Sequence, residues 1–343
     1  MTTIAKIIGA LGLVVVVAPA GAHHSTANFD TGETIEFRAT VKKFEYTNPH
    51  SHLYLERVNA DGSKEDWVVE MGSIPAMRPS GISPDKLKAG DVIIFRGSPD
   101  KDRNKKYVLF SQVVKEDGTV FGRERVAGAP RAAAIPTTPG SKDFTGVWSN
   151  MGSGATGARP FFALVDYDVT ARGKAQLAAF KEEDDPALKC EKHGIPRSIY
   201  GPYPRSITRS DKTVDIHYEF LDVNRAIHLD QKTHPANGKH THIGHSIGWF
   251  EGDTLVVDTA NFAAQKWGNG RGLDSSDRKH MVERYTLGDN GNTMTVEFTV
   301  TDPMYLSKPA VEKYKFRYTP DYKIAAFNCN VHSAQTFVEQ AKK

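Results

Sequence analysis

The chain has few cysteines and only one long apolar run, and both scarcities limit its class. Two cysteines, Cys190 and Cys329, occur among 343 residues, too few for a framework of several disulfides or a cysteine-rich metal cluster. The apolar run at residues 7–18 is shorter than the ~20 residues that a membrane-spanning helix needs. Lys and Arg total 44 against 41 Asp and Glu, so no excess charge favours nucleic acid or an anionic membrane as a partner.

The amino terminus has the composition of an export signal. Lys6 precedes the apolar run, and Ala20-Gly21-Ala22 is the small-x-small pattern after which signal peptidase cuts. We therefore expect residues 1–22 to be a signal peptide and the mature protein to be periplasmic or secreted, with an uncleaved anchor as the alternative. In an oxidising compartment Cys190 and Cys329 are expected to form a disulfide, which would close a long loop and add ~4 kcal/mol.

Cleavage after Ala22 would place a histidine at the new amino terminus. The amine and ring nitrogen of His23 can chelate a divalent ion, copper in particular, and His50 or His52 could supply a further ligand. His50 and His52 share one face if their segment is extended. The alternative is a frayed terminus whose histidines are solvated.

Residues 23–126 have the pattern of a small barrel. Five segments show strand patterns, and the turn at 59–62 predicts a hairpin between the second and the third. Ser83 and Pro84 predict a short helix at 83–87. Five strands and one helix suggest an oligonucleotide/oligosaccharide-binding (OB) type of barrel, here without the basic and aromatic surface of a nucleic-acid binder. The expected strands are 34–41, 52–58, 66–71, 89–97 and 107–114.

A linker rich in Pro, Ala and Gly at 127–141 leads to a second module, residues 142–343. This module opens with Gly146-Val147-Trp148, as lipocalin-like barrels do, and has an amphipathic helix at 170–181 capped by Thr170. Strand patterns separated by turns follow, so we expect a lipocalin-like antiparallel β-barrel and an all-β protein. The expected strands are 206–209, 213–220, 224–229, 241–250, 254–259, 279–287, 293–301, 311–318 and 324–328.

Titratable side chains concentrate between residues 225 and 259. A strand at 239–250 would place His240 and His242 on one face, a spacing that would also suit zinc. His245 would join them if the glycine before it forms a bulge. The histidines of this stretch are His228, His234, His240, His242 and His245, and its carboxylates are Asp230, Glu251, Asp253 and Asp258.

The turn at 251–253 should return the chain so that Asp258 lies opposite the histidines. A histidine beside a carboxylate is a reasonable acid–base pair, here lined by aromatic side chains at a barrel mouth. The structural alternative is that the histidines are partly solvated and that Arg225 pairs with Asp230 or Glu283. The candidates are His242 and His245 as base, Asp258 and Glu251 as orienting carboxylates, and Arg225 and Tyr218 as groups that stabilise developing negative charge.

Two resemblances cover most of the mature chain. The segments CEKHGIPR (190–197) and GHSIGWFEGDTLVVDT (244–259), with Arg225 to Asp230 between them, resemble a family of exported, uncharacterised bacterial proteins. His23-His24-Ser25 and Asn48-Pro49-His50 resemble a second uncharacterised exported family. Neither resemblance implies an activity, and His240 and His242 depart from the first pattern.

Three functions remain in view from the sequence. The first is an exported lyase, hydratase or isomerase that uses the histidine/carboxylate pair on a small hydrophobic substrate and requires no cofactor. The second is a periplasmic copper- or zinc-binding protein that uses His23. The third is a binder of a lipophilic small molecule without chemistry. We expect no nucleotide, nicotinamide or serine-hydrolase chemistry, no nucleic acid partner and no stable insertion into a membrane.

Overall fold

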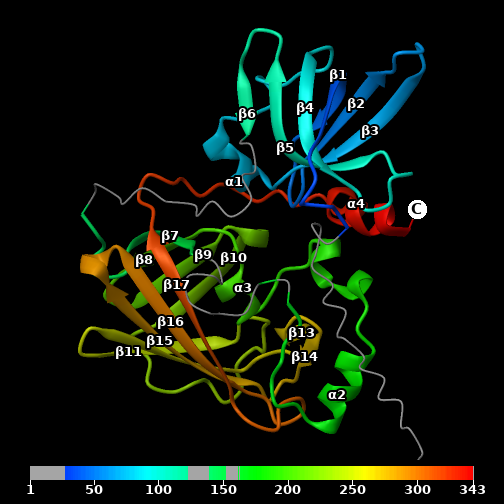
Figure 1. Cartoon of the computed structure of the whole chain (residues 1–343). Coiled ribbons are helices and arrows are strands. Elements are labelled where there is room, and N and C mark those ends of the chain that lie inside the picture. Colours follow the sequence, from blue (N-terminus) through cyan, green and yellow to red (C-terminus); the bar gives the residue numbers. More distant parts are fainter. Residues whose placement is uncertain (1–27, 123–138, 152–160, 162, 343) are drawn as a thin grey trace, which may run out of the picture.

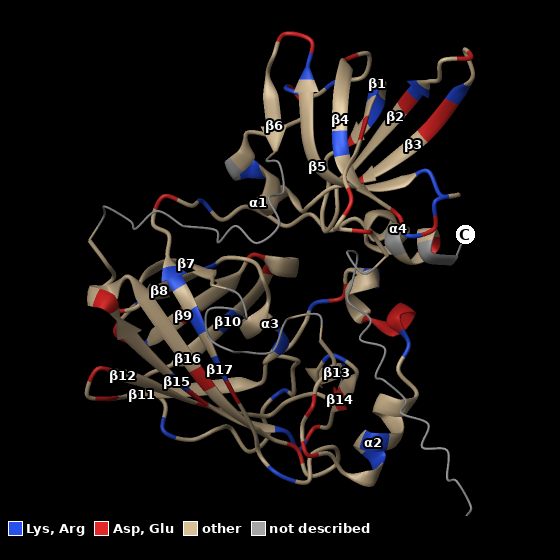
Figure 2. Ribbon diagram, viewed as in Figure 1, with Lys and Arg blue, Asp and Glu red and all other residues tan. Residues whose placement is uncertain are grey.

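The computed structural model describes residues 28–122, 139–151, 161 and 163–342. The expected signal peptide, His23 and most of the expected linker lie outside these residues. Figure 1 shows two β-barrels, the first in blue to cyan and the second in green to orange. Lys and Arg, in blue, and Asp and Glu, in red, are both scattered over the two barrels (Figure 2). None of the described helices is long and apolar enough to cross a membrane.

The first barrel is OB-like, as the sequence predicts. Its strands run in the order β3-β2-β1-β4-β5-β6, and a parallel pairing of β3 with β5 closes the barrel. Gly62 has φ +83° in the β2–β3 hairpin, a conformation that glycine adopts without strain. The bounds are β1 Ile35–Glu45, β2 His52–Val58, β3 Lys64–Glu70, β4 Val92–Pro99, β5 Tyr107–Lys115 and β6 Val120–Gly122.

The helix of the first barrel lies earlier in the chain than predicted. The expected helix at 83–87 is wrong, because these residues form only turns. Helix α1, Ile74–Met77, forms instead. Its first amides are capped by the Ser73 side chain and by Asn48 Oδ1, which accepts a hydrogen bond from the Ile74 amide at 2.9 Å. The Asn48 cap comes from a distant segment, so local sequence did not reveal it.

The second barrel is closed by nine strands in the order β10-β11-β12-β15-β16-β17-β7-β8-β9. Trp148 is fully buried in its core, and its indole N–H donates to the Phe144 carbonyl at 2.8 Å. The strands are β7 Gly146–Asn150, β8 Arg205–Arg209, β9 Thr213–Tyr218, β10 Val223–His228, β11 His245–Glu251, β12 Thr254–Ala260, β15 His280–Gly288, β16 Thr293–Thr301 and β17 Ala310–Tyr318. The other elements are β13 Gln265–Gly270, β14 Leu273–Ser275, α2 Ala171–Ala178 and α3 Arg197–Tyr200.

One pairing departs from a simple up-and-down barrel. Strands β10 and β11 are parallel, so the chain must cross over between them. The crossover loop, residues 229–244, returns along the outer face, where His234 contacts side chains of β11 and β12. This loop carries three of the five histidines between residues 225 and 259, namely His234, His240 and His242.

A connecting segment, residues 319–342, links the second barrel to the first. The expected strand at 324–328 is wrong, since these residues have no regular structure. Cys329 forms the predicted disulfide with Cys190 and pairs with Asn48 of the first barrel. Helix α4, Val331–Lys342, follows at the base of the first barrel (Figure 1).

Candidate functional site

The wall of the second barrel divides the predicted site residues into two groups. Side chains alternate between the faces of each strand. Arg225, Tyr218 and their neighbours point into the core, whereas His245 and Asp258 lie on the outer face. Arg225 and Tyr218 therefore cannot act beside His245, contrary to the predicted arrangement.

Inside the wall, Arg225 has a structural role. Its guanidinium donates to both carboxylate oxygens of Glu283, at 2.8 and 2.9 Å, and to Ser246 and Thr259. Burial would lower the pKa of Arg225, but the Glu283 carboxylate outweighs it and raises the pKa. Of the two predicted partners, Glu283 is therefore the correct one. Within the described chain the buried Tyr218 hydroxyl has no hydrogen-bond partner.

Outside the wall, five side chains form what we call the histidine cluster: His228, His234, His245, Asp258 and His280. Asp258 Oδ1 lies 2.7 Å from His234 Nε2, and both carboxylate oxygens lie 3.0 Å from His280 Nε2. His234 Nδ1 lies 2.9 Å from His245 Nδ1. The His228 ring stacks on His245 with the centroids 5.1 Å apart.

Strand register explains how the cluster assembles. The β11–β12 hairpin has Gly252 in its turn at φ +58°, and it pairs Ile247 with Asp258. Asp258 therefore lies next to the histidine segment, as predicted. On its other side, Asp258 pairs with Val282 of β15, which brings His280 into reach.

The charges in the cluster follow from its contacts. Burial raises the pKa of Asp258, but the hydrogen bonds from His280 and His234 outweigh it, so the pKa lies below its ordinary value. The hydrogen bond to Asp258 raises the pKa of His280. Burial, with help from His228 and His234, lowers the pKa of His245. At neutral pH Asp258 is therefore a carboxylate and His245 is neutral.

The other predicted catalytic residues lie away from this centre. Strand β11 starts at His245 rather than near residue 239, because Gly244 has φ +68° and breaks the extended chain. The predicted shared strand face of His240 and His242 is thus wrong. His240 Nδ1 lies 2.8 Å from the Phe262 carbonyl, and His242 is exposed.

Glu251 is also remote from the cluster. It lies at the β11–β12 turn, at the far end of β11 from His245. Its carboxylate accepts hydrogen bonds from Trp249 at 3.0 Å and from Arg284 at 2.8 Å. These contacts make it part of an exposed ion pair and not the carboxylate that orients the histidines.

The histidines proposed for a metal site in the first barrel differ in environment. His52 is 1% exposed, and burial lowers its pKa to about 4. His50 Nδ1 lies 3.4 Å from the Glu70 carboxylate. His52 is therefore not available to an ion at the surface. Across the described ranges, no group of three His, Cys, Asp or Glu residues could hold a metal ion.

Two short glycine patterns that sequence reasoning overlooked bear on the excluded enzyme classes. Residues 244–248 match Gly-x-Ser-x-Gly, but Ser246 lies within strand β11 and bonds Arg225 inside the barrel, whereas a nucleophile elbow needs an exposed strand-to-helix turn. Residues 152–157 match Gly-x-Gly-x-x-Gly and lie outside the described residues. The dinucleotide motif belongs to a parallel βαβ unit, whereas the described strands of the second barrel pair antiparallel except at β10–β11.

Sequence reasoning also missed His280 as a site residue, and it named His234 only as one of the histidines between residues 225 and 259. Both contact Asp258, but one is on β15 and the other on the crossover loop. No spacing in the sequence links them to Asp258. Only the strand order β11-β12-β15 could have placed His280 beside it.

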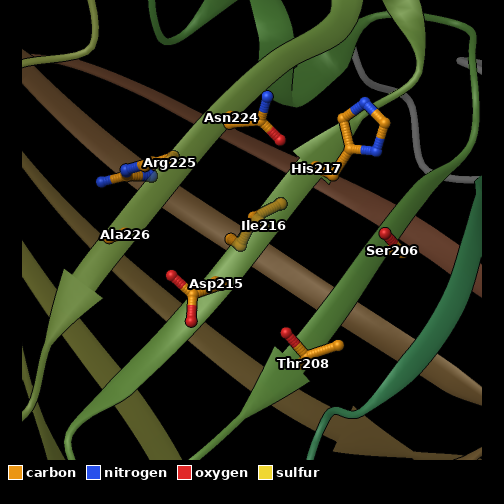
Figure 3. A pocket seen from close by; sticks show the side chains of 8 residues that line it. All are labelled: Ser206, Thr208, Asp215, Ile216, His217, Asn224, Arg225 and Ala226. Carbon is orange, nitrogen blue, oxygen red and sulfur yellow. The ribbon is translucent and has the colours of Figure 1, made fainter. Parts of the chain in front are cut away.

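A polar groove of about 470 Å³ adjoins the cluster on the outer face of β8, β9 and β10 (Figure 3). The side chains that face it are Ser206, Thr208, Asp215, His217, Asn224 and Ala226. Ala226 precedes His228 by two residues on β10, so the groove ends roughly 7 Å along the strand from the cluster. The Arg225 guanidinium lies on the other side of the wall with Glu283.

The protein thus combines an OB-like barrel with a closed barrel of nine described strands that carries an outer histidine cluster. A family of unknown function, DUF6152, matches residues 11–108 and describes no activity. No curated protein matches the chain. The fluorescent protein UnaG is similar to about half of the chain: the wild type has 16% identity and TM-score 0.23 and covers 51% of this chain and 97% of its own. An asparagine-to-alanine variant has 15% identity and TM-score 0.25, with 52% and 97% covered. Likeness at this level carries no functional argument.

Proposed function

We propose that the protein is an exported lyase, hydratase or isomerase that acts on a small molecule by acid–base chemistry and needs no cofactor. The observation that carries the proposal is the chain of contacts from Asp258 through His234 to His245, at 2.7 and 2.9 Å. A carboxylate that orients a histidine, and a neutral histidine beside it, are the parts a general base requires.

The surroundings of the cluster indicate the type of substrate. Val282 flanks Asp258 on the outer face, and Trp249, 39% exposed, lies on the same face about 13 Å further along β11. The groove on the other side of His228 presents hydroxyl, carboxylate and amide groups among apolar atoms. These surfaces fit a small molecule with an apolar body and a hydroxyl or carbonyl group. The Cys190–Cys329 disulfide supports export to an oxidising compartment.

Proton exchange can test the proposal before the substrate is known. Small carbonyl and hydroxy compounds are incubated with the protein in D₂O, and deuterium incorporation is followed by NMR. We expect exchange with the native protein and its loss with His245→Ala. His242→Ala is the matched control, because His242 is exposed on the crossover loop just before His245 and lies outside the cluster. Exchange that survives His245→Ala would reject the proposed base.

Binding without chemistry is the second candidate, and the groove is the observation that favours it. This function predicts saturable ligand binding that Asp215→Ala weakens, with no deuterium incorporation. The same exchange experiment therefore separates the two candidates.

A further inference from the structure

The hydrogen bonds of the histidine cluster restrict which ring nitrogens can carry a proton. The contact of His234 Nε2 with the Asp258 carboxylate requires a proton on that nitrogen, because a carboxylate only accepts. The 2.9 Å contact between the two Nδ1 atoms can hold only one proton. If His234 is neutral, its Nδ1 accepts, and His245 must donate from Nδ1. His245 Nε2 then carries the free electron pair.

We infer that His234 and His245 form a proton relay in which a proton accepted at His245 Nε2 is stored on His234 beside Asp258. When Nε2 takes a proton, the Nδ1 proton of His245 crosses to His234 Nδ1. The result is a neutral His245 protonated at Nε2 and a His234 imidazolium that donates to the Asp258 carboxylate. One proton enters and one imidazolium forms, so the charge balances. The inference rests on the proposed function only for the source of the proton.

The position of Asp258 explains why the charge would settle on His234. Asp258 contacts His234 directly, whereas His245 faces the rings of His228 and His234. A carboxylate at hydrogen-bond distance favours the charged form of an imidazole, whereas neighbouring imidazoles do not. His245 thus acts as the entry point, and His234 holds the charge.

The same geometry limits the number of protons that the His234–His245 pair can take up. A second proton on the pair would place two N–H groups against each other at the Nδ1–Nδ1 contact, so the pair accepts only one. His280 regulates this capacity, because it shares the Asp258 carboxylate. A protonated His280 competes with His234 for the same negative charge. The groups that face the pair are therefore His228 on β10, Asp258 on β12 and His280 on β15.

Imidazole tautomers provide a direct test that needs no substrate. In ¹⁵N-labelled protein, two-bond ¹H–¹⁵N correlations distinguish an Nδ1–H ring, an Nε2–H ring and an imidazolium. The midpoint of the pair is the pH at which half of the His234–His245 pairs have taken up the proton. Above this pH we expect His245 as the Nδ1–H tautomer. Acidification should convert it to the Nε2–H tautomer while His234 becomes the imidazolium. The inference is overturned if His245 itself takes the first charge, or if it is an Nε2–H ring throughout.

Two variants should shift the midpoint in opposite directions. Asp258→Asn removes the charge beside His234 and should lower the midpoint pH by about one unit or more. His280→Ala leaves the carboxylate to His234 alone and should raise it. His242→Gln is the matched control and should leave it unchanged. A midpoint that neither Asp258→Asn nor His280→Ala changes would also overturn the relay. Tautomer conversion without deuterium exchange would reject the proposed function and keep the relay. Deuterium exchange without tautomer conversion would keep the proposed function and reject the relay.

Discussion

Replacing Glu283 with glutamine should strongly destabilise the second barrel. The side chains of Arg225 and Glu283 are 1% and 0% exposed, and two hydrogen bonds of 2.8 and 2.9 Å join them. Glutamine keeps the size of the side chain but leaves a buried guanidinium without a counter-charge. Loss of one partner of a buried ion pair costs about 3–5 kcal/mol, and we expect a loss of that size.

The barrel offers a matched control on its surface. Arg284 and Glu251 are also 2.8 Å apart, but their side chains are 45% and 49% exposed. Glu251→Gln should therefore cost no more than about 1 kcal/mol. Urea unfolding followed by circular dichroism measures both variants, with the midpoint compared at constant slope.

Removing both buried charges should recover most of the lost stability. A variant with Arg225→Met and Glu283→Leu leaves no unpaired charge, and such replacements are often neutral or stabilising. If Glu283→Gln costs less than about 1 kcal/mol, or no more than Glu251→Gln, the assignment of Arg225 to structure is refuted. A double variant as unstable as the single one would mean that packing and not charge dominates at this position.

Three further predictions concern stability. Burial disfavours the charge of Lys279 and lowers its pKa to about 7, against 10.5 ordinarily. Between these values the unfolded chain binds more protons than the folded one, so the free energy of unfolding should rise with pH. Urea unfolding at pH 7 and 9.5 should show this rise, and Lys279→Met should abolish it. The pKa of His52 is about 4 through burial, against 6.5 ordinarily; stability should fall as pH drops from 6.5 to 4, and His52→Leu should flatten the fall. Replacing Cys190 and Cys329 with serine should cost about 4–5 kcal/mol in the same assay, since the bridge spans 139 residues; an unchanged midpoint would contradict the loop-closure argument.

Local patterns in the sequence predicted most elements of the fold. Alternation of apolar and polar residues identified β2 and β16 with their observed bounds, and Thr170 marked the start of α2. The predictions failed where distant contacts decide. Residues 324–328 have a strand pattern, but they lie beside the second barrel without pairing into it, and Phe327 donates its amide to Asp222.

Local sequence patterns also predicted only part of the histidine cluster. The hairpin turn at Gly252 is a local signal, and it correctly placed Asp258 next to His245's strand. His280 belongs to β15, which pairs with β12 although 19 residues, 261–279, separate the two strands in the chain. The parallel crossover before β11 carries His234 over the wall, and no periodicity encodes that path.

The connecting segment sets the order in which the molecule can be completed. Residues 319–342 follow both barrels in the chain, yet Asn330 and Ser333 hydrogen-bond to Asn48 and His50 of the first barrel. Each barrel has a core of its own and is synthesised before this segment. The two barrels can therefore fold one after the other. Arg78 of the first barrel lies 3.8 Å from Glu219 of the second, and the segment adds its own contacts between the barrels once it has emerged and docked. A chain stopped after β17 should lack the contacts that this segment makes between the barrels, and the second barrel should also lose the buried Phe327 and the Cys190–Cys329 bridge.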